Sequence, residues 1–124
     1  MKKLLTGDEA IAGGLYEADV SFASAYPGTP STEILENVAK YDGMYAEWAP
    51  NEKVAMEASI GASMSGVRSF AAIKMVGVNV AADPLFTFSY LAINGGFAFV
   101  SADDPGMHSS QNEQDSRHYA IAAK

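Results

Sequence analysis

Four short apolar segments alternate with helical segments along this chain, and the alternation constrains the fold more than any other feature. The apolar runs 20–26, 44–48, 68–75 and 96–102 each predict a buried β-strand. Helices are predicted from a cap at Thr6 or Asp8 to residue 19, at 31–40 and 52–65, within 79–93, and at 113–124. Because right-handed crossovers join parallel strands, we predict an α/β fold: a three-layer α/β/α sandwich with a parallel sheet.

The length of 124 residues is compatible with a single domain. No linker, repeat or low-complexity segment interrupts the alternation. Parallel sheets of this kind seldom stop at four strands, and no strand follows the last predicted helix. We therefore expect residues 1–124 to be a truncated domain, a fragment of a longer subunit.

The composition excludes several classes of function. The net charge is −7 with only eight Lys and Arg residues, so we expect no nucleic-acid and no anionic-membrane partner. The absence of cysteine excludes disulfides, thiolate metal sites and cysteine catalysis within this chain. We find no signal peptide and no apolar stretch long enough to span a bilayer, and we therefore expect a cytoplasmic protein.

The loops that follow the predicted strands indicate where a ligand would bind. The carboxyl ends of parallel strands share one rim, and ligands of open α/β sheets bind there. The loops of this rim are 27–31, 49–52, 76–79 and 103–114. They are richer in Gly, Pro, Asn and hydroxyl residues than the connections of the opposite rim, which indicates a functional rim.

Thr29 and Glu52 are the candidate ligand-binding residues of this rim. Thr29 precedes a helix, so its hydroxyl either caps that helix or, with nearby backbone amides, holds an acid substrate. Glu52 begins the next helix, and its carboxylate either stabilises the helix dipole from a solvated position or serves as a functional acid. Glu47 is the alternative functional acid, and its neighbour Trp48 is expected in the core.

Three other groups of residues give weaker signals. Asp103, Asp104 and His108 could bind a divalent metal, but their spacing matches no ligand signature, and a turn with aspartate caps is the favoured interpretation. We therefore predict no metal site. The segment 76–79 lacks the repeated glycines and the lysine of a phosphate-binding loop, and the serine and histidine spacing builds no nucleophile triad.

Five sequence motifs occur in one register and cover essentially the whole chain. They are Thr6-Gly7-Asp8-Glu9-Ala10, Ala25-Tyr26-Pro27-Gly28-Thr29-Pro30-Ser31-Thr32-Glu33, Glu47-Trp48-Ala49-Pro50-Asn51-Glu52-Lys53-Val54-Ala55, Val76-Gly77-Val78-Asn79-Val80-Ala81-Ala82-Asp83-Pro84, and the segment 101–115. In this order they resemble the N-terminal part of the alpha subunit of indolepyruvate ferredoxin oxidoreductases, in the superfamily of thiamine-diphosphate 2-oxoacid:ferredoxin oxidoreductases.

The resemblance implies a pyrimidine-binding domain of the thiamine-diphosphate-binding fold. In that family the cofactor lies between this domain and a diphosphate-binding domain of the same subunit, which holds Mg²⁺. Glu52 matches the glutamate that hydrogen-bonds N1′ of the aminopyrimidine, and Thr29 matches the residue near the substrate carboxylate. Gly28, Gly77 and Asn79 are implied, with Glu52, to contact the cofactor.

The implied reaction is the oxidative decarboxylation of a 2-oxoacid, an arylpyruvate such as indolepyruvate, to an acyl-CoA in anaerobic metabolism. The implied partners are a second subunit, iron–sulfur clusters, ferredoxin and coenzyme A. This chain lacks a Gly-Asp-Gly…Asn motif for Mg²⁺-diphosphate and has no cluster cysteine, so we expect it to be inactive alone and, as a fragment, to form a homodimer. Met75 stands where many relatives have histidine, which leaves the choice of 2-oxoacid open.

Two further functions stay open on the residues alone. One is a non-catalytic module of the same fold that packs against another subunit through the Gly/Ala-rich helix 52–65; a solvated Glu52 far from any cleft would favour it. The other is a small flavodoxin-like binding protein or metal-dependent hydrolase that uses Asp103, Asp104 and His108; tight binding of a divalent metal would favour it.

Overall fold

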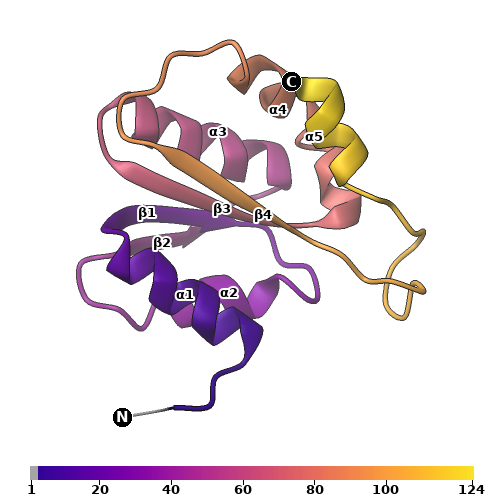
Figure 1. Cartoon of the computed structure of the whole chain (residues 1–124), viewed down its shortest axis with the longest axis horizontal. Helices are drawn as coiled ribbons and strands as arrows, with labels where there is room; N and C mark the ends of the chain where they lie inside the picture. Colours follow the sequence, from indigo (N-terminus) through magenta and orange to yellow (C-terminus); the bar gives the residue numbers. More distant parts are fainter. Residues whose placement is uncertain (1–2) are drawn as a thin grey trace.

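All four predicted strands lie in one parallel sheet in the computed structural model, which describes residues 3–124. The strands are β1 (Val20–Ala25), β2 (Tyr45–Trp48), β3 (Arg68–Lys74) and β4 (Phe97–Ala102), in the order β2-β1-β3-β4 (Figure 1). Phe70 of β3 is in register with Ala23 of β1 on one side and Ala98 of β4 on the other. β1 and β3 are therefore the central strands.

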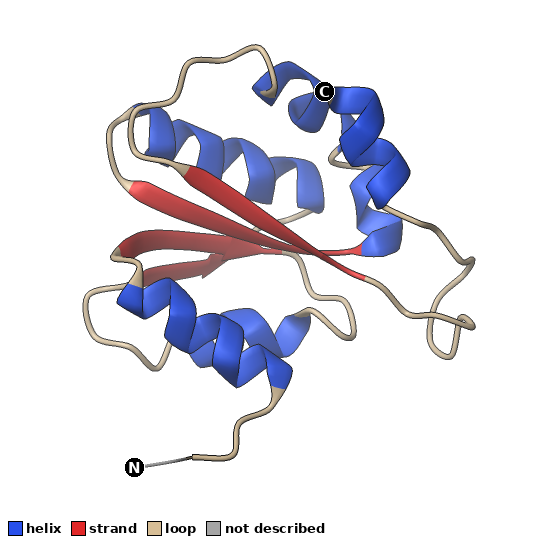
Figure 2. Ribbon diagram, viewed as in Figure 1, coloured by secondary structure: helices blue, strands red, loops and turns tan. Residues whose placement is uncertain are grey.

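Helices cover both faces of this sheet. α1 (Gly7–Glu17) and α2 (Thr32–Val38) lie on one face, and α3 (Glu52–Met64), α4 (Ala82–Phe88) and α5 (Arg117–Ala123) lie on the other (Figure 2). The predicted three-layer α/β/α sandwich is confirmed. Each face buries its own apolar cluster. One cluster gathers Ala12, Ile34, Leu35 and Val38 under α1 and α2, and the other gathers Met56, Ile60, Ile73, Val78 and Leu85 under α3 and α4.

Thr6 caps α1, which settles the choice between Thr6 and Asp8. The backbone N–H of Glu9 donates to the Thr6 hydroxyl at 3.2 Å, and the N–H of Thr6 donates to the Glu9 carboxylate at 2.9 Å. This reciprocal pair is a capping box, which satisfies two backbone donors that the first helical turn would otherwise leave free.

Buried serines hold α3 close to the centre of the sheet. The Ser59 hydroxyl, which is fully buried, donates to the carbonyl oxygens of Phe70 in β3 and Ala55 in α3, both at 2.9 Å. The Ser69 hydroxyl donates back to the Ser59 carbonyl. Because these bonds tie helix to strand directly, they fix where α3, and thus its first residue Glu52, lies relative to the rim.

Element boundaries differ from the prediction at the carboxyl end of β3 and at the start of α5. The strand predicted to reach Met75 ends at Lys74, and Met75–Asn79 forms a 3-10 helix, η1, in place of a loop. Its carbonyl at Gly77 accepts from the N–H of both Val80 and Ala81, which tightens the turn. The last helix starts at Arg117, not at residue 113, because the Asp115 carboxylate accepts from the Arg117 N–H at 3.0 Å and the chain before it stays extended as a loop.

The expectation that Trp48 lies in the core is wrong. Its side chain is 46% exposed, because β2 is an edge strand and only one side of it is paired, with β1. Over residues 3–124, the structure contains no helix with the length and apolar character that crossing a bilayer requires.

Candidate functional site

The four loops predicted to share a rim meet at the carboxyl ends of the parallel strands. β1 and β3 are neighbours, but the chain leaves β1 toward β2 on one side and leaves β3 toward β4 on the other. This reversal makes the β1/β3 boundary the topological switch point of the sheet. Open α/β sheets bind ligands in the crevice outside the strand ends at such a point.

Glu52 is the first residue of α3 and is half-buried, but it does not cap the helix. Asn51 does so, since its side-chain oxygen accepts from the Val54 N–H at 3.0 Å. The Glu52 carboxylate takes part in none of the side-chain hydrogen bonds or ion pairs within residues 3–124. A carboxylate at a helix start that is neither a cap nor an ion-pair partner is available to a ligand on the rim.

Gly77 of η1 packs directly against the Glu52 side chain. A Cβ atom at Gly77 would lie 2.6 Å from Glu52 Cγ and 2.7 Å from Cδ, and it would be nearer still to Oε1. A side chain at position 77 would therefore displace the Glu52 side chain from its present position. The contact joins the start of α3 to the turn after β3, so it brings together two residues that the motifs had singled out separately.

The loop after β1 is closed by Ser31 and Thr32, not by Thr29. The Gly28 N–H donates to the Thr32 hydroxyl at 2.9 Å, and the Ser31 hydroxyl donates to the Gly28 carbonyl at 2.7 Å. Thr29 is exposed, and its hydroxyl makes no hydrogen bond with a residue in the range 3–124. The interpretation of Thr29 as a helix cap is thus wrong.

The Asn79 side chain has a hydrogen-bond partner other than Glu52 or Gly77. It is exposed at the end of η1, and its side-chain oxygen accepts a hydrogen bond from the hydroxyl of Tyr119 in α5. That bond ties η1 to the last helix and leaves only the amide NH₂ of Asn79 for another partner.

The loop after β4 folds around Asp104. The Asp104 carboxylate accepts from the Ser109 N–H at 2.8 Å and from the Ser110 hydroxyl at 2.7 Å, and these bonds lower the pKa of Asp104. No group of three His, Cys, Asp or Glu residues within 3–124 has the geometry of a metal site. The turn stabilised by aspartate is confirmed, and the structure gives the metal-site alternative no support.

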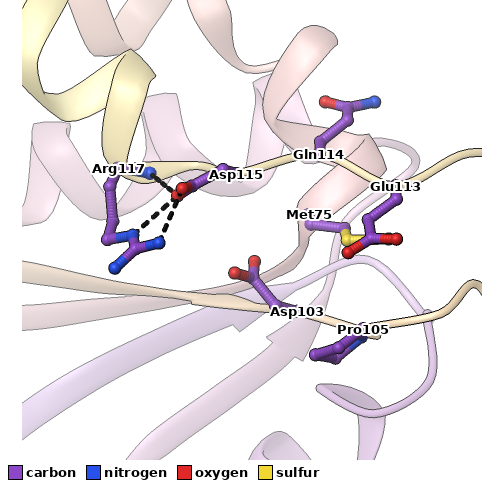
Figure 3. A pocket seen from close by; sticks show the side chains of 7 residues that line it. All are labelled: Met75, Asp103, Pro105, Glu113, Gln114, Asp115 and Arg117. Atoms are coloured by element: carbon purple, nitrogen blue, oxygen red, sulfur yellow. Dashed lines mark hydrogen bonds and ion pairs between the residues drawn. The ribbon is translucent and has the colours of Figure 1, made fainter.

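A cavity of about 190 Å³ opens between this loop and η1. Its lining residues are Met75, Asp103, Pro105, Glu113, Gln114, Asp115 and Arg117 (Figure 3). The Arg117 guanidinium donates two hydrogen bonds, of 2.8 and 2.7 Å, to the Asp115 carboxylate. These bonds lower the pKa of Asp115 to about 2. Glu52 and Thr29 are not among the residues that line this cavity. In this chain they therefore lie on the rim outside the pocket.

Lys74 is a rim residue that the sequence analysis missed, whereas Met75 was noted there for replacing a histidine of many relatives. Met75 is fully buried, and its sulfur accepts from the Asp104 N–H at 3.4 Å. The Lys74 ammonium donates to the Ser109 carbonyl at 2.7 Å, while its stem lies against Gly28. Lys74 lies near the end of an apolar run. The sequence pattern therefore predicts that it is part of a strand and does not indicate a role on the rim.

Comparison with known proteins gives one family match. The model described as "Pyruvate flavodoxin/ferredoxin oxidoreductase, thiamine diP-bdg" matches residues 13–86, a range that includes Gly28, Thr29, Glu52, Gly77 and Asn79.

Individual relatives agree with that match. The chain is 54% identical to the indolepyruvate oxidoreductase subunit IorA of Archaeoglobus fulgidus, over 99% of this chain and 21% of the subunit. It is 36% identical to the pyruvate synthase subunit PorA of Methanocaldococcus jannaschii, over 70% of this chain and 24% of that one. The chain spans about a fifth of the length of the curated relatives it matches.

A solved structure shares the fold. It is the 2-oxoglutarate:ferredoxin oxidoreductase from Magnetococcus marinus with 2-oxoglutarate, coenzyme A and succinyl-CoA bound. The match has a TM-score of 0.72 and 26% sequence identity, and it covers 82% of this chain and 18% of the solved chain.

Proposed function

This chain belongs to the pyruvate flavodoxin/ferredoxin oxidoreductase family, of which it is a thiamine diphosphate-binding part, and we propose that it forms one wall of the active site of a 2-oxoacid:ferredoxin oxidoreductase. The family resemblance drawn from the motifs is thereby confirmed. The complete enzyme oxidatively decarboxylates a 2-oxoacid to an acyl-CoA and passes the electrons to ferredoxin. The identity to IorA over nearly the whole chain, higher than that to PorA, supports an arylpyruvate of the indolepyruvate type as the substrate.

The residues on the rim fit the aminopyrimidine ring of thiamine diphosphate. The supporting observation is the contact between Glu52 and Gly77: a half-buried glutamate whose carboxylate has no partner in the described chain packs against Gly77, where a Cβ atom would displace it. Such a carboxyl group can share a proton with a ring nitrogen in one hydrogen bond, and the lack of a side chain at Gly77 gives Glu52 its place on the rim. When bound, thiamine diphosphate supplies the carbon nucleophile and electron sink for decarboxylation.

Each candidate residue has a role that its environment supports. Glu52 holds a proton shared with the ring at N1′, and Gly77 keeps water from one side of the carboxylate. The hydroxyl of the exposed Thr29 donates to the substrate, and Gly28 brings the backbone of that loop close to the site. Asn79 contributes its free NH₂ group, while its oxygen stays bonded to Tyr119.

The remaining groups of the reaction belong to other parts of the complete enzyme. This chain has no cysteine to hold an iron–sulfur cluster, so the clusters are carried elsewhere. The diphosphate and its Mg²⁺ are bound by a second domain, which forms the opposite wall of the site and closes the open rim around Glu52 and Thr29. The alternative of a non-catalytic packing module predicts a solvated Glu52 far from any cleft. Glu52 is half-buried against Gly77 but lies outside the lining of the cavity beside η1, so the activity of a Glu52 variant decides between the two.

Glu52→Gln in the complete enzyme tests this function. The amide keeps the size of the side chain but cannot hold the proton, so turnover of indolepyruvate should fall by about 100-fold or more with the fold intact. Glu57→Gln is the matched control, because Glu57 lies on the exposed face of the same helix, 3.9 Å from Lys53. Near-normal turnover by Glu52→Gln would overturn the role of Glu52, and a wild-type enzyme that neither binds thiamine diphosphate nor oxidises any 2-oxoacid would overturn the function.

A further inference from the structure

Lys74 is a buried cation at the topological switch point of the sheet. It is the last residue of the central strand β3 and is only 9% exposed. Its ammonium donates to one backbone carbonyl, that of Ser109, at 2.7 Å. Within residues 3–124 no carboxylate lies within 4.0 Å of this ammonium.

A buried ammonium without a carboxylate is costly, because one carbonyl neither neutralises the charge nor uses all three of its donors. The chain has 15 Asp and Glu against 8 Lys and Arg, so it has more than enough carboxylates to pair every cation, including Lys74. The two aspartates that follow β4 have other partners: Asp104 accepts from Ser109 and Ser110, and Asp103 accepts from the Ser116 hydroxyl at 3.5 Å. The unpaired charge therefore indicates a site for an anion from outside this chain.

The stem of Lys74 is held in a fixed position by Gly28. A Cβ atom at Gly28 would lie 3.0 Å from Lys74 Cβ and 3.3 Å from Lys74 Cδ, so the loop after β1 packs directly on the lysine. Thr29 is the next residue of that loop. The ammonium thus lies between the loops that follow β1 and β4, and each loop has an exposed residue, Thr29 and Ser109, whose hydroxyl has no partner among the described residues.

We propose that Lys74 is the cation that binds the carboxylate of the 2-oxoacid substrate, with the Thr29 hydroxyl as a second donor. This proposal rests on the proposed function. A single ammonium and a hydroxyl match the charge and the two oxygens of a monoanionic carboxylate. A diphosphate needs more positive charge than this rim offers, since Lys53 is paired with Asp83 at 2.8 Å and Arg117 with Asp115 at 2.7 Å.

The experiment compares a carboxylate with its uncharged counterpart in the complete enzyme. 3-Phenylpropionate and 3-phenylpropionamide are used as competitive inhibitors of arylpyruvate oxidation, and their inhibition constants are measured for the wild type and for Lys74→Met. Methionine keeps an unbranched apolar stem against Gly28 and removes the charge. The wild type should prefer the acid, and Lys74→Met should lose that preference by about 10- to 100-fold and raise the KM for the 2-oxoacid to a similar extent.

Two control variants separate substrate binding from effects on the loop or on overall charge. Asp104→Asn weakens the same β4 loop but leaves Lys74 in place, and Lys53→Met removes a cation of the same kind from the start of α3. Both should keep the preference for the acid. The KM for coenzyme A and the affinity for thiamine diphosphate, measured by calorimetry, should not change in Lys74→Met.

Each outcome decides for or against the lysine. If Lys74→Met keeps the preference for the acid, or instead raises the KM for coenzyme A, the proposal is wrong while the oxidoreductase function stands. A wild-type enzyme that binds acid and amide equally overturns the proposal without any variant, even if Lys74→Met fails to fold. Absence of thiamine-diphosphate binding and of 2-oxoacid oxidation in the wild type overturns the function itself.

Discussion

The side chain of Glu52 lies so close to the backbone of Gly77 that any side chain at position 77 would displace it. A Cβ atom on Gly77 would come within 2.6 Å of Glu52 Cγ, well inside the distance at which carbon atoms meet. The contact joins the first residue of α3 to the middle of η1. The position of the carboxylate is therefore set by the turn that follows β3 as well as by its own helix.

Gly77→Ala should disable the site without unfolding the domain. The added methyl group must displace the Glu52 side chain, and a displacement of about 1 Å costs about 100-fold in rate when a catalytic group must be positioned accurately. Turnover of the complete enzyme with a 2-oxoacid is the measurement. Gly61→Ala is the matched control, because a Cβ there meets nothing within 4 Å, and it should leave turnover unchanged. Equal activity of the two variants would show that the contact has no bearing on function.

The layers of the fold could be predicted because they depend on local pattern. Each strand is a short apolar run, and α1 and α3 start at capping residues, so the alternation alone implies a parallel sheet covered on both faces. The strand order β2-β1-β3-β4 was not predicted, since it depends on contacts between distant segments. Trp48 was misplaced for that reason, because only the strand order reveals that β2 is at the edge.

Ser59→Ala should destabilise the 124-residue chain by about 1 kcal/mol, since it removes a buried hydroxyl that bonds α3 to the Phe70 carbonyl of β3. Urea denaturation followed by circular dichroism measures the change. Ser65→Ala is the control: that hydroxyl also donates to a carbonyl, that of Ala62, but from an exposed position, so its loss should have little effect. Two variants of equal stability would mean that the bond from Ser59 does not anchor the helix.

The stability of the 124-residue chain should fall in acid through Asp115. Hydrogen bonds and charge from Arg117 lower the pKa of Asp115 in the folded state from 3.8 to about 2. A carboxyl whose pKa is lowered by folding stabilises the folded state above its unfolded pKa, and that contribution disappears as the pH falls through the folded pKa. Part of the loss between pH 3.8 and about 2 is therefore assigned to Asp115.

Asp115→Asn is the variant that isolates this contribution. It should be less stable than the wild type at neutral pH, and the urea midpoints of the two should converge as the pH approaches 2. Both groups are exposed, so the difference should shrink in high salt. A constant difference across this pH range would contradict the assignment.

The candidate site was only partly predictable. Glu52 and Thr29 were identified by motif, and the cap of α3 by Asn51 follows from its place just before the helix. The contact of Glu52 with Gly77 depends on the 3-10 geometry of η1, which no sequence pattern predicted. Lys74 was hidden because a lysine at the end of an apolar run is ordinarily a strand end at the surface, whereas here Gly28 packs over its stem.

In the loop after β1, we expect substitution of Thr29 to affect substrate binding and substitution of Thr32 to affect stability. Thr32 accepts from the Gly28 N–H at 2.9 Å, so Thr32→Val should lower the stability of the chain by about 1 kcal/mol. Thr29 makes no such bond within residues 3–124, so Thr29→Val should leave stability unchanged and instead raise the KM of the complete enzyme for its 2-oxoacid, by about tenfold. Thr29→Ser, which keeps the hydroxyl, should restore most of the affinity.

The opposite pattern would return Thr29 to a structural role. If Thr29→Val lowered the urea midpoint of the chain as much as Thr32→Val does, the hydroxyl would be stabilising the start of α2. If KM were unchanged in both Thr29 variants, the hydroxyl would not touch the substrate. The urea midpoint reports a bond inside the folded chain, and the KM reports a bond to a bound substrate. Measured together, they show whether the hydroxyls of Thr29 and Thr32 act in substrate binding or in stability.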